Sequence, residues 1–238
     1  MFVHGYDSCR HDVSAITSHL SPDIVESQGV YIVSFDRPGH GESDPNPKQT
    51  VKSIALDIEE LADQLGLGSR FYVVGFSLGG QFVWTCLKYI PHRLAGAALL
   101  APVVNYWWAG LPSNMTGEAY KHQLPQDQWA FRVAHYMPWL NYWWNTQKLF
   151  PGLSLIAHSP KVLSQQDVEL IPRIFSIRGE YQGDEDRVVP VKLQRYIARH
   201  LPWINYHELT SAGHMFPFAD GMADSIIQAL LDGNKGPS

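Results

Sequence analysis

Residues 75–79 read Gly-Phe-Ser-Leu-Gly and fit the pattern G-x-S-x-G, in which the central serine serves as a nucleophile. The apolar run at residues 71–74 predicts a buried strand before this segment, and a helix is predicted to begin at Leu78. A strand that turns directly into a helix holds its central serine in strained backbone geometry, and the flanking glycines avoid collisions with the crossing backbone. The N-terminus of the helix directs N–H groups at the same point and can stabilise an oxyanion. The segment therefore predicts acyl-transfer chemistry at Ser77, with a plain surface turn as the alternative.

A serine hydroxyl is a poor nucleophile at neutral pH, so it needs a base within hydrogen-bond reach and an acid that orients the base. The sequence offers both later in the chain, in the order serine, acid, histidine. An acidic turn at residues 183–190 contains Asp184, Glu185 and Asp186, each of which is a candidate acid. His214 follows a predicted strand and is the candidate base. The competing interpretations are a solvated acidic turn and an ordinary structural histidine.

Six apolar runs have the continuity of strands and alternate with amphipathic helical segments. The predicted strands lie at residues 2–5, 30–35, 71–74, 94–104, 174–177 and 204–209. The predicted helices lie at residues 10–20, 51–65, 81–89 and 191–200, and a closing helix directs Met222, Ile226, Ile227 and Leu230 inward. Thr50 is placed to cap the second of these helices and Gly66 to end it. This alternation predicts an α/β fold with a mostly parallel sheet flanked by helices.

The character of the chain changes at residues 106–165, where the pattern becomes helical and irregular. Six of the eight tryptophans fall in this stretch. We expect it to be a helical, Trp-rich cap inserted into a single domain that spans residues 1–238. Aromatic side chains here either pack the cap onto the core or line an apolar acyl pocket. The candidates for the pocket are Trp107, Trp108 and Trp143, together with Phe76 beside the serine.

Composition excludes several classes of function. The formal net charge is −5 and there is no basic run, which argues against nucleic acid as a partner. Two cysteines, Cys9 and Cys86, predict thiols rather than a disulfide framework. No apolar run reaches the ~18 residues of a membrane span and no secretion signal opens the chain, so we expect a cytoplasmic location. Without metal-ligand spacing or a dinucleotide fingerprint, we expect no cofactor and no metal, and a small-molecule substrate as the partner. The oligomeric state stays open.

Several motifs together resemble those of a known family, and they occur in the order in which that family has them. The matching segments are His4-Gly5, residues 36–43 (Asp-Arg-Pro-Gly-His-Gly-Glu-Ser), residues 75–80, residues 183–190 and Gly213-His214. The chain resembles the α/β-hydrolase superfamily and is most similar to plant α/β-hydrolases that have a serine nucleophile. The set of motifs is far more specific than any one of them alone.

The resemblance implies a role for each matching residue. Ser77 corresponds to the nucleophile, His214 to the general base and acid, and Asp186 to the carboxylate that orients His214. The backbone N–H groups of Tyr6 and Leu78 correspond to the oxyanion hole. Asp36, in contrast, is expected to be a turn residue that binds its own loop rather than a catalyst.

Two features depart from the family pattern. Only Met1, Phe2 and Val3 precede the His4-Gly5 turn, so we expect the first strands of the family to be missing and the sheet edge to be exposed. The segment between the predicted strand at residues 174–177 and the acidic turn is shorter than in the related plant proteins. If residues 173–177 do not replace the family's strand, we expect Asp186 to be displaced.

Three functions are compatible with this pattern. The first is a serine hydrolase that cleaves a small, apolar ester through an acyl intermediate on Ser77. The second is a ligand-binding or receptor protein of the same fold with little turnover. The third is an inactive, shortened member of the family. Epoxide hydrolase and haloalkane dehalogenase chemistry are disfavoured, because those relatives have an aspartate at the position of Ser77.

Overall fold

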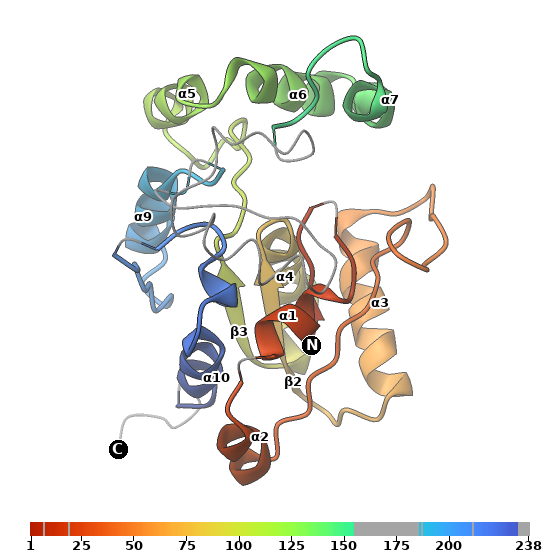
Figure 1. Cartoon of the computed structure of the whole chain (residues 1–238), viewed down its shortest axis with the longest axis vertical. Coiled ribbons are helices and arrows are strands. Elements are labelled where there is room, and N and C mark those ends of the chain that lie inside the picture. The colour runs from red at the N-terminus through yellow and green to blue at the C-terminus, as the bar shows by residue number, and fades with distance from the viewer. Residues whose placement is uncertain (7, 19, 155–185, 187, 211, 233–238) are drawn as a thin grey trace. The chain divides into compact units, whose positions relative to one another are not determined.

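The computed structural model describes residues 1–6, 8–18, 20–154, 186, 188–210 and 212–232 (Figure 1). The chain forms two compact units. The first contains Met1–Val103 together with Pro217–Ser238, and the second contains Val104–Phe216. The predicted strand at residues 174–177 and the acidic residues Asp184 and Glu185 lie outside the described residues.

A parallel sheet organises the first unit. Its strands are β1 (Phe2–Val3), β2 (Phe71–Phe76) and β3 (Leu94–Leu100), in the order β1-β2-β3. Both neighbouring pairs are parallel, so the predicted α/β class with a parallel sheet is confirmed. Strand β2 lies centrally, with Val3 opposite Gly75 on one side and Leu100 opposite Phe76 on the other.

The predicted strand at residues 30–35 is wrong in extent. Only one bridge forms there, between Ser34 and Phe2, together with a hydrogen bond from Phe2 N to Val33 O of 2.7 Å. Because β1 has only two residues, it offers too short a partner for a longer ladder. Phe2 and Val3 are buried, whereas Tyr31 is 75% exposed. Of residues 30–35 only Tyr31 is exposed and the others are half-buried, so the expected exposed edge is limited to that residue.

Two helices cover one face of the sheet. Helix α4 (Gly79–Tyr89) packs on β2 and β3, and α3 (Val51–Gln64) packs on α4. Alternate residues of β2 point to this face, as the period of a strand requires. The buried cluster beneath the helices comprises Val3, Ile54, Ala55, Ile58, Ala62, Phe71, Val73, Val83, Cys86 and Ile90. Helix α3 also begins as predicted, since Thr50 and Ser53 form a reciprocal capping box.

The other face of the sheet contacts the C-terminal helix, α10 (Met222–Asp232). Tyr72 and Phe76 point to this face, because they alternate with the residues under α4. The Phe76 ring packs edge-on against Phe218 at a centroid distance of 5.6 Å. A carboxylate oxygen of Asp224 on α10 accepts a 2.8 Å hydrogen bond from Ser21 N. Segments from both ends of the first unit therefore close around the sheet.

Short helices connect β1 to residue 30. The predicted helix at residues 10–20 is observed as α1 (Asp12–Thr17), and a further helix, α2 (Pro22–Gln28), was not predicted. Pro22 occupies the first turn of α2, where its missing N–H group is tolerated, and Gly29 ends the helix at φ 61°. A 3₁₀ turn, η1 (Pro91–Arg93), links α4 to β3.

Residues 104–154 of the second unit form helices joined by irregular segments, with no strand. The unit contains α5 (Ser113–Lys121), α6 (Pro125–Tyr136), the 3₁₀ turn η2 (Pro138–Leu140) and α7 (Asn141–Thr146), with α9 (Val191–His200) later in the chain. The 3₁₀ turn η4 (Phe216–Phe218) begins at the last residue of this unit and continues into the first unit. Helix α6 packs against α7, and α5 packs against α9. Within the described part of the chain, no helix is long and apolar enough to cross a membrane.

The strand predicted at residues 204–209 is wrong: these residues form no strand, and residues 205–209 are exposed. The apolar and polar side chains in this segment do not separate into one buried face. Instead, Glu208 accepts hydrogen bonds from Arg195 Nε at 2.8 Å and from the Tyr206 hydroxyl at 3.1 Å. The segment is therefore held by polar surface contacts with α9.

Candidate active site

Ser77 lies at the junction of β2 and α4, as predicted. Its φ is 51°, a left-handed conformation that is costly for a residue with a side chain. Backbone hydrogen bonds hold it there: Ser77 N donates to Leu100 O at 2.8 Å, while Ser77 O accepts from Gly80 N at 3.0 Å and from Val103 N at 3.2 Å. The predicted strained turn is therefore confirmed, and it is fixed by the strand next to it.

The glycines around Ser77 permit close backbone approaches. A Cβ atom at Gly75 would lie 2.5 Å from Gly79 O, and one at Gly79 would overlap Val3 O. Both approaches involve backbone atoms, which cannot move aside as a flexible side chain can. The glycines of the pattern are therefore required by packing around the serine.

The turn after β1 borders the same serine. A Cβ atom added at Gly5 would lie 3.5 Å from Ser77 Cβ, and one at Gly79 would lie 2.9 Å from His4 O. Segments 70 residues apart in the chain thus meet at the end of the parallel strands. The first unit brings Gly5 and the adjoining Tyr6, one of the two predicted oxyanion donors, to the serine turn that carries the other donor, Leu78.

The predicted acid and base are brought together in the second unit. Asp186 Oδ2 lies 2.7 Å from His214 Nδ1, and His214 is only 2% exposed. Asp186 Oδ1 accepts hydrogen bonds from Val188 N at 3.0 Å and Val189 N at 2.7 Å. Both carboxylate oxygens are thus engaged, and the contact to Nδ1 favours the tautomer with its proton on that nitrogen. Such a histidine has Nε2 as its basic atom.

The charge of Asp186 acts on Tyr106, an aromatic side chain of the second unit. Burial raises the pKa of Tyr106, and the negative charge of Asp186 raises it further. Trp107 lies next to Tyr106, with its indole stacked on His135 at 4.3 Å and its Nε1 donating to the Tyr136 hydroxyl at 3.2 Å. Trp107 is therefore held rigidly within the second unit.

The other pocket candidates differ in exposure. Trp108 is 53% exposed and Trp143 is 46% exposed. Phe76 is 1% exposed and packs on Phe218, so its side chain belongs to the core of the first unit. The site residues are divided between the units: Tyr6, Phe76, Ser77 and Leu78 belong to the first, and the remaining candidates belong to the second. Pairing of Ser77 with His214 stays a prediction.

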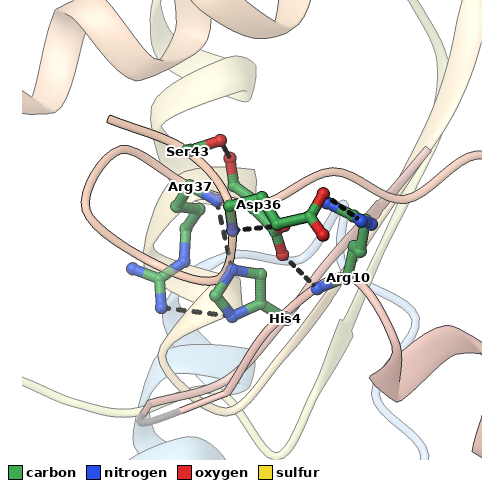
Figure 2. A network of polar contacts seen from close by, with 6 residues as sticks. His4, Arg10, Asp36, Arg37 and Ser43 are labelled. Carbon is green, nitrogen blue, oxygen red and sulfur yellow. Dashed lines mark hydrogen bonds and ion pairs between the residues drawn. The ribbon is translucent and has the colours of Figure 1, made fainter. Parts of the chain in front are cut away.

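Asp36 is the centre of a polar network in the first unit (Figure 2). Its carboxylate accepts hydrogen bonds from Arg10 N at 2.7 Å and Glu42 N at 3.1 Å, and pairs with Arg10 Nη1 at 2.5 Å. Burial alone would raise the pKa of Asp36, but these N–H groups and the Arg10 guanidinium together lower it. A Cβ atom at Gly41 would overlap the carboxylate. These contacts match a residue that holds its own loop.

Arg37 and His4 form the other half of the network, and sequence reasoning missed this role of Arg37. Arg37 is 3% exposed, its N donates to His4 Nε2 at 3.2 Å, and its Nη2 donates to Gly5 O at 2.6 Å. Burial, followed by the charge of Arg37, lowers the pKa of His4 to about 3. The signal that could have revealed this role is the position of Arg37, directly after a predicted strand and inside a turn-rich motif.

Both cysteines are free thiols, as predicted. Burial raises the pKa of Cys86 to about 12, so this thiol is protonated and inert at neutral pH. Within the part of the chain that the structure describes, no cluster of three or more His, Cys, Asp or Glu side chains could hold a metal ion.

Comparison with solved structures shows the same fold in other proteins at low identity. A thermophilic esterase from Thermogutta terrifontis, solved with malate bound, has a TM-score of 0.60 at 18% identity, over 98% of this chain and 88% of that one. Proline iminopeptidase from Mycobacterium smegmatis has a TM-score of 0.54 at 15% identity, over 98% and 89%. Est816, described as an N-acyl homoserine lactone degrading enzyme, has a TM-score of 0.51 at 17% identity, over 98% and 91%.

Sequence comparison gives one curated relative and a family match. The dihydrolipoyllysine-residue acetyltransferase component of the acetoin cleaving system from Cupriavidus necator is 29% identical over 104 residues, which are 43% of this chain and 26% of that protein. The match thus spans about a quarter of the length of that relative. The alpha/beta hydrolase family model matches residues 1–227, nearly the whole chain. This chain therefore belongs to the alpha/beta hydrolase family.

Proposed function

We propose that the protein is a serine hydrolase that cleaves small, apolar esters through an acyl intermediate on Ser77. The observation that carries the proposal is the left-handed backbone of Ser77, φ 51°, at the end of a buried parallel strand and in contact with the Gly5 turn. Backbone strain of this kind persists only where the surrounding structure enforces it, and it concentrates at active sites. The hydrogen bond between Asp186 and His214 supplies the matching acid–base pair.

In this mechanism His214 Nε2 accepts the proton of the Ser77 hydroxyl as its oxygen attacks the ester carbonyl carbon. Asp186 keeps the imidazole oriented and stabilises the imidazolium that forms. The backbone N–H groups of Tyr6 and Leu78 donate to the oxyanion of the tetrahedral intermediate. His214 then returns the proton to the departing alcohol. A water molecule, deprotonated by the same histidine, releases the carboxylic acid and regenerates Ser77.

The proposed substrate class follows from the aromatic side chains of the second unit. The charge of Asp186 acts on Tyr106, and Trp107 packs edge-on against Tyr106, so the two rings offer apolar surface suited to an acyl or alkyl group. The structural relatives are described as an esterase, an iminopeptidase and a lactone-degrading enzyme, and enzymes of these kinds act on acyl carbonyl groups. An ester is the simplest member of this class.

Activity-based labelling tests the proposal directly. A fluorophosphonate probe should label the wild-type protein on Ser77, and p-nitrophenyl esters of short acids should be turned over. Both signals should vanish in Ser77→Ala. The matched control is Ser225→Ala, since Ser225 is exposed on α10 and its hydroxyl donates to the carbonyl oxygen of Gly221, the residue just before that helix.

The outcomes separate the candidate functions. Loss of label and turnover in Ser77→Ala alone supports the hydrolase. Turnover that persists in Ser77→Ala, or label on another residue, contradicts it. Label on Ser77 with negligible turnover of every ester would favour a ligand-binding protein of the same fold.

A further inference from the structure

Arg37 is a buried cation next to the proposed oxyanion-binding turn. Only 3% of the residue is exposed, and within the described residues its buried Nε has no hydrogen-bond partner. Burial lowers the pKa of Arg37 to about 10, so the guanidinium still carries its charge at neutral pH. Removing a cation from water costs several kcal/mol unless its contacts compensate. Its contacts therefore indicate what the charge accomplishes.

The negative charge of Asp12 favours the charged guanidinium, and the shortest hydrogen bond described for Arg37 is to a backbone carbonyl. Arg37 Nη2 donates to Gly5 O at 2.6 Å, and His4 Nδ1 lies 3.1 Å from the same oxygen. The Arg37 backbone N donates to His4 Nε2 at 3.2 Å, which places the ring proton of His4 on Nδ1 and makes it a second donor to Gly5 O. Figure 2 shows the Arg37 side chain reaching down beside the His4 ring.

The guanidinium is also held from a second direction. Its central carbon lies 4.9 Å from the centroid of the Phe82 ring, within the range of a cation–π contact. Phe82 lies on α4, the helix that begins immediately after Ser77. Arg37 thus connects the nucleophile helix to the turn after β1.

A planar trans peptide transmits this contact to Tyr6. In the Gly5–Tyr6 peptide, which is trans, the carbonyl and the N–H group point in opposite directions. A carbonyl fixed toward Arg37 therefore directs the Tyr6 N–H away from Arg37. A charged donor on the carbonyl also polarises the peptide, which strengthens its N–H as a donor. Gly5 itself borders Ser77, because a Cβ atom at Gly5 would lie 3.5 Å from Ser77 Cβ.

We propose that Arg37 is a positioning residue that fixes and polarises the Gly5–Tyr6 peptide, so that the Tyr6 N–H becomes a strong donor to the oxyanion. The inference rests on the proposed hydrolase function and adds a residue to it. Arg37 does not touch the substrate in this arrangement. Its effect on catalysis passes through the peptide bond that it holds.

Arg10 provides a matched comparison on the same network. Its guanidinium binds Asp36 at 2.5 Å and Glu42 at 2.6 Å, and both of these partners lie in the loop that carries Arg37. Replacing Arg10 removes a cation and both of its ion pairs to this loop while leaving the Arg37–Gly5 hydrogen bond in place. The two arginines therefore separate loop stability from control of the peptide.

The experiment compares Arg37→Lys, Arg37→Ala and Arg10→Gln with the wild type on a p-nitrophenyl ester. For Arg37→Ala we expect kcat to fall roughly 10- to 100-fold, with KM changed by less than about threefold. This fall should not exceed the one caused by removing an oxyanion donor altogether. Arg37→Lys should retain part of the lost kcat, because a lysine ammonium can still donate to the carbonyl. Arg10→Gln should stay within about twofold of the wild type.

Two further readouts distinguish positioning from simple stabilisation. Millimolar guanidinium chloride should partly restore kcat of Arg37→Ala, whereas sodium chloride at the same ionic strength should not. The rate of fluorophosphonate labelling of Ser77 should fall with kcat, because the phosphonyl oxygen uses the same donors. If Arg37→Ala does not fold, the kcat and the labelling rate of Arg37→Lys are compared with those of the wild type instead.

The inference and the underlying function fail differently. A wild type that neither turns over esters nor labels on Ser77 overturns the proposed function. An active wild type whose Arg37 variants match Arg10→Gln in kcat overturns the role of Arg37. Equal losses of kcat in all three variants, tracking their melting temperatures, would also overturn it, because the loop as a whole would then be responsible.

Discussion

The nucleophile and the acid–base pair are held in different ways. Ser77 is fixed by backbone: its N–H and C=O bond to the ends of neighbouring segments, and glycines let those segments approach. Among the described contacts, side chains hold the Asp186–His214 pair through the hydrogen bond between them, and loop N–H groups hold the carboxylate. The serine turn therefore leaves no room for side chains at its glycines, whereas the orientation of His214 depends on the charge of Asp186.

The two units also differ in how they bury apolar side chains. The first has a continuous core in which Ile54, Ile58, Val73 and Val83 have no exposed surface. The second exposes large aromatic residues along η2 and α7, where Trp139 is 79% exposed. Substitutions of equal size should therefore change the free energy of unfolding by different amounts in the two units.

The largest effect is expected from Asp186→Asn. This change keeps the shape of the side chain but removes the charge that fixes the His214 tautomer, so kcat should fall by about 10³–10⁴-fold with little change in melting temperature. Glu208→Gln is the control, because Glu208 carries a comparable charge on the exposed surface of the same unit. Steady-state ester hydrolysis measures both. Equal rates for Asp186→Asn and the wild type would assign the acid to another residue.

The next effect compares one glycine from each unit. Gly79→Ala places a methyl group into Val3 O and should lower the free energy of unfolding by roughly 3 kcal/mol, with loss of Ser77 labelling. Gly117→Ala, inside α5, meets nothing within 4 Å and should raise it by about 0.5–1 kcal/mol. Denaturant titration of both variants decides the point. Similar effects at the two positions would remove the contrast between the units.

Acid should destabilise the first unit through His4. The pKa of His4 is about 3 in the folded protein because burial and then Arg37 disfavour the cation, against a value of 6.5 in the unfolded chain. Below pH 6.5 the unfolded chain therefore binds a proton that the folded protein does not, and stability falls as pH decreases toward 3. The slope contributed by His4 should approach ~1.4 kcal/mol per pH unit.

Melting temperatures of the wild type and His4→Gln between pH 7 and pH 4.5 isolate this contribution. The glutamine variant should be less stable at pH 7, since its amide replaces the imidazole imperfectly. Its stability should nevertheless change less as pH falls. Parallel pH profiles would show that His4 is protonated without cost.

The smallest effect is expected on the exposed aromatic surface. Trp139→Ser should change the free energy of unfolding by less than about 0.5 kcal/mol, because its ring is mostly in solvent. Trp107→Ser should lower it by about 1–2 kcal/mol, because it removes stacking on His135 and a hydrogen bond to Tyr136. Denaturant titration of both variants tests the difference. A large loss in Trp139→Ser would show that its ring is buried in solution.

Local features were predictable from the sequence because neighbours along the chain produce them. The capping box at Thr50 joins residues of one helical turn, and the motif that predicts the strained serine turn is a run of adjacent residues. The role of Asp36 was also foreseen, since an aspartate in a turn commonly binds N–H groups of its own loop. In each case the predictive signal lies in a few adjacent residues, although Leu100 also holds the serine turn and Arg10 also binds Asp36.

Features that depend on distant partners were predicted less well. The segment at residues 30–35 has the composition of a strand, but its length as a strand is limited by β1. The segment at residues 204–209 contains apolar residues typical of a strand, and yet it lies mostly at the surface. A strand requires a partner, and sequence alone does not specify which partner is present or how long it is.

The sequence by itself determined the family, the parallel α/β class and the serine turn, because glycine spacing and apolar periodicity are local constraints on the backbone. Only the tertiary structure decided that Asp186 meets His214 and that the guanidinium of Arg37 lies buried against Gly5 O. These contacts join residues 28 and 32 positions apart, where no local rule operates. Which charges meet depends on how the strands are ordered and packed, and that is a property of the folded chain.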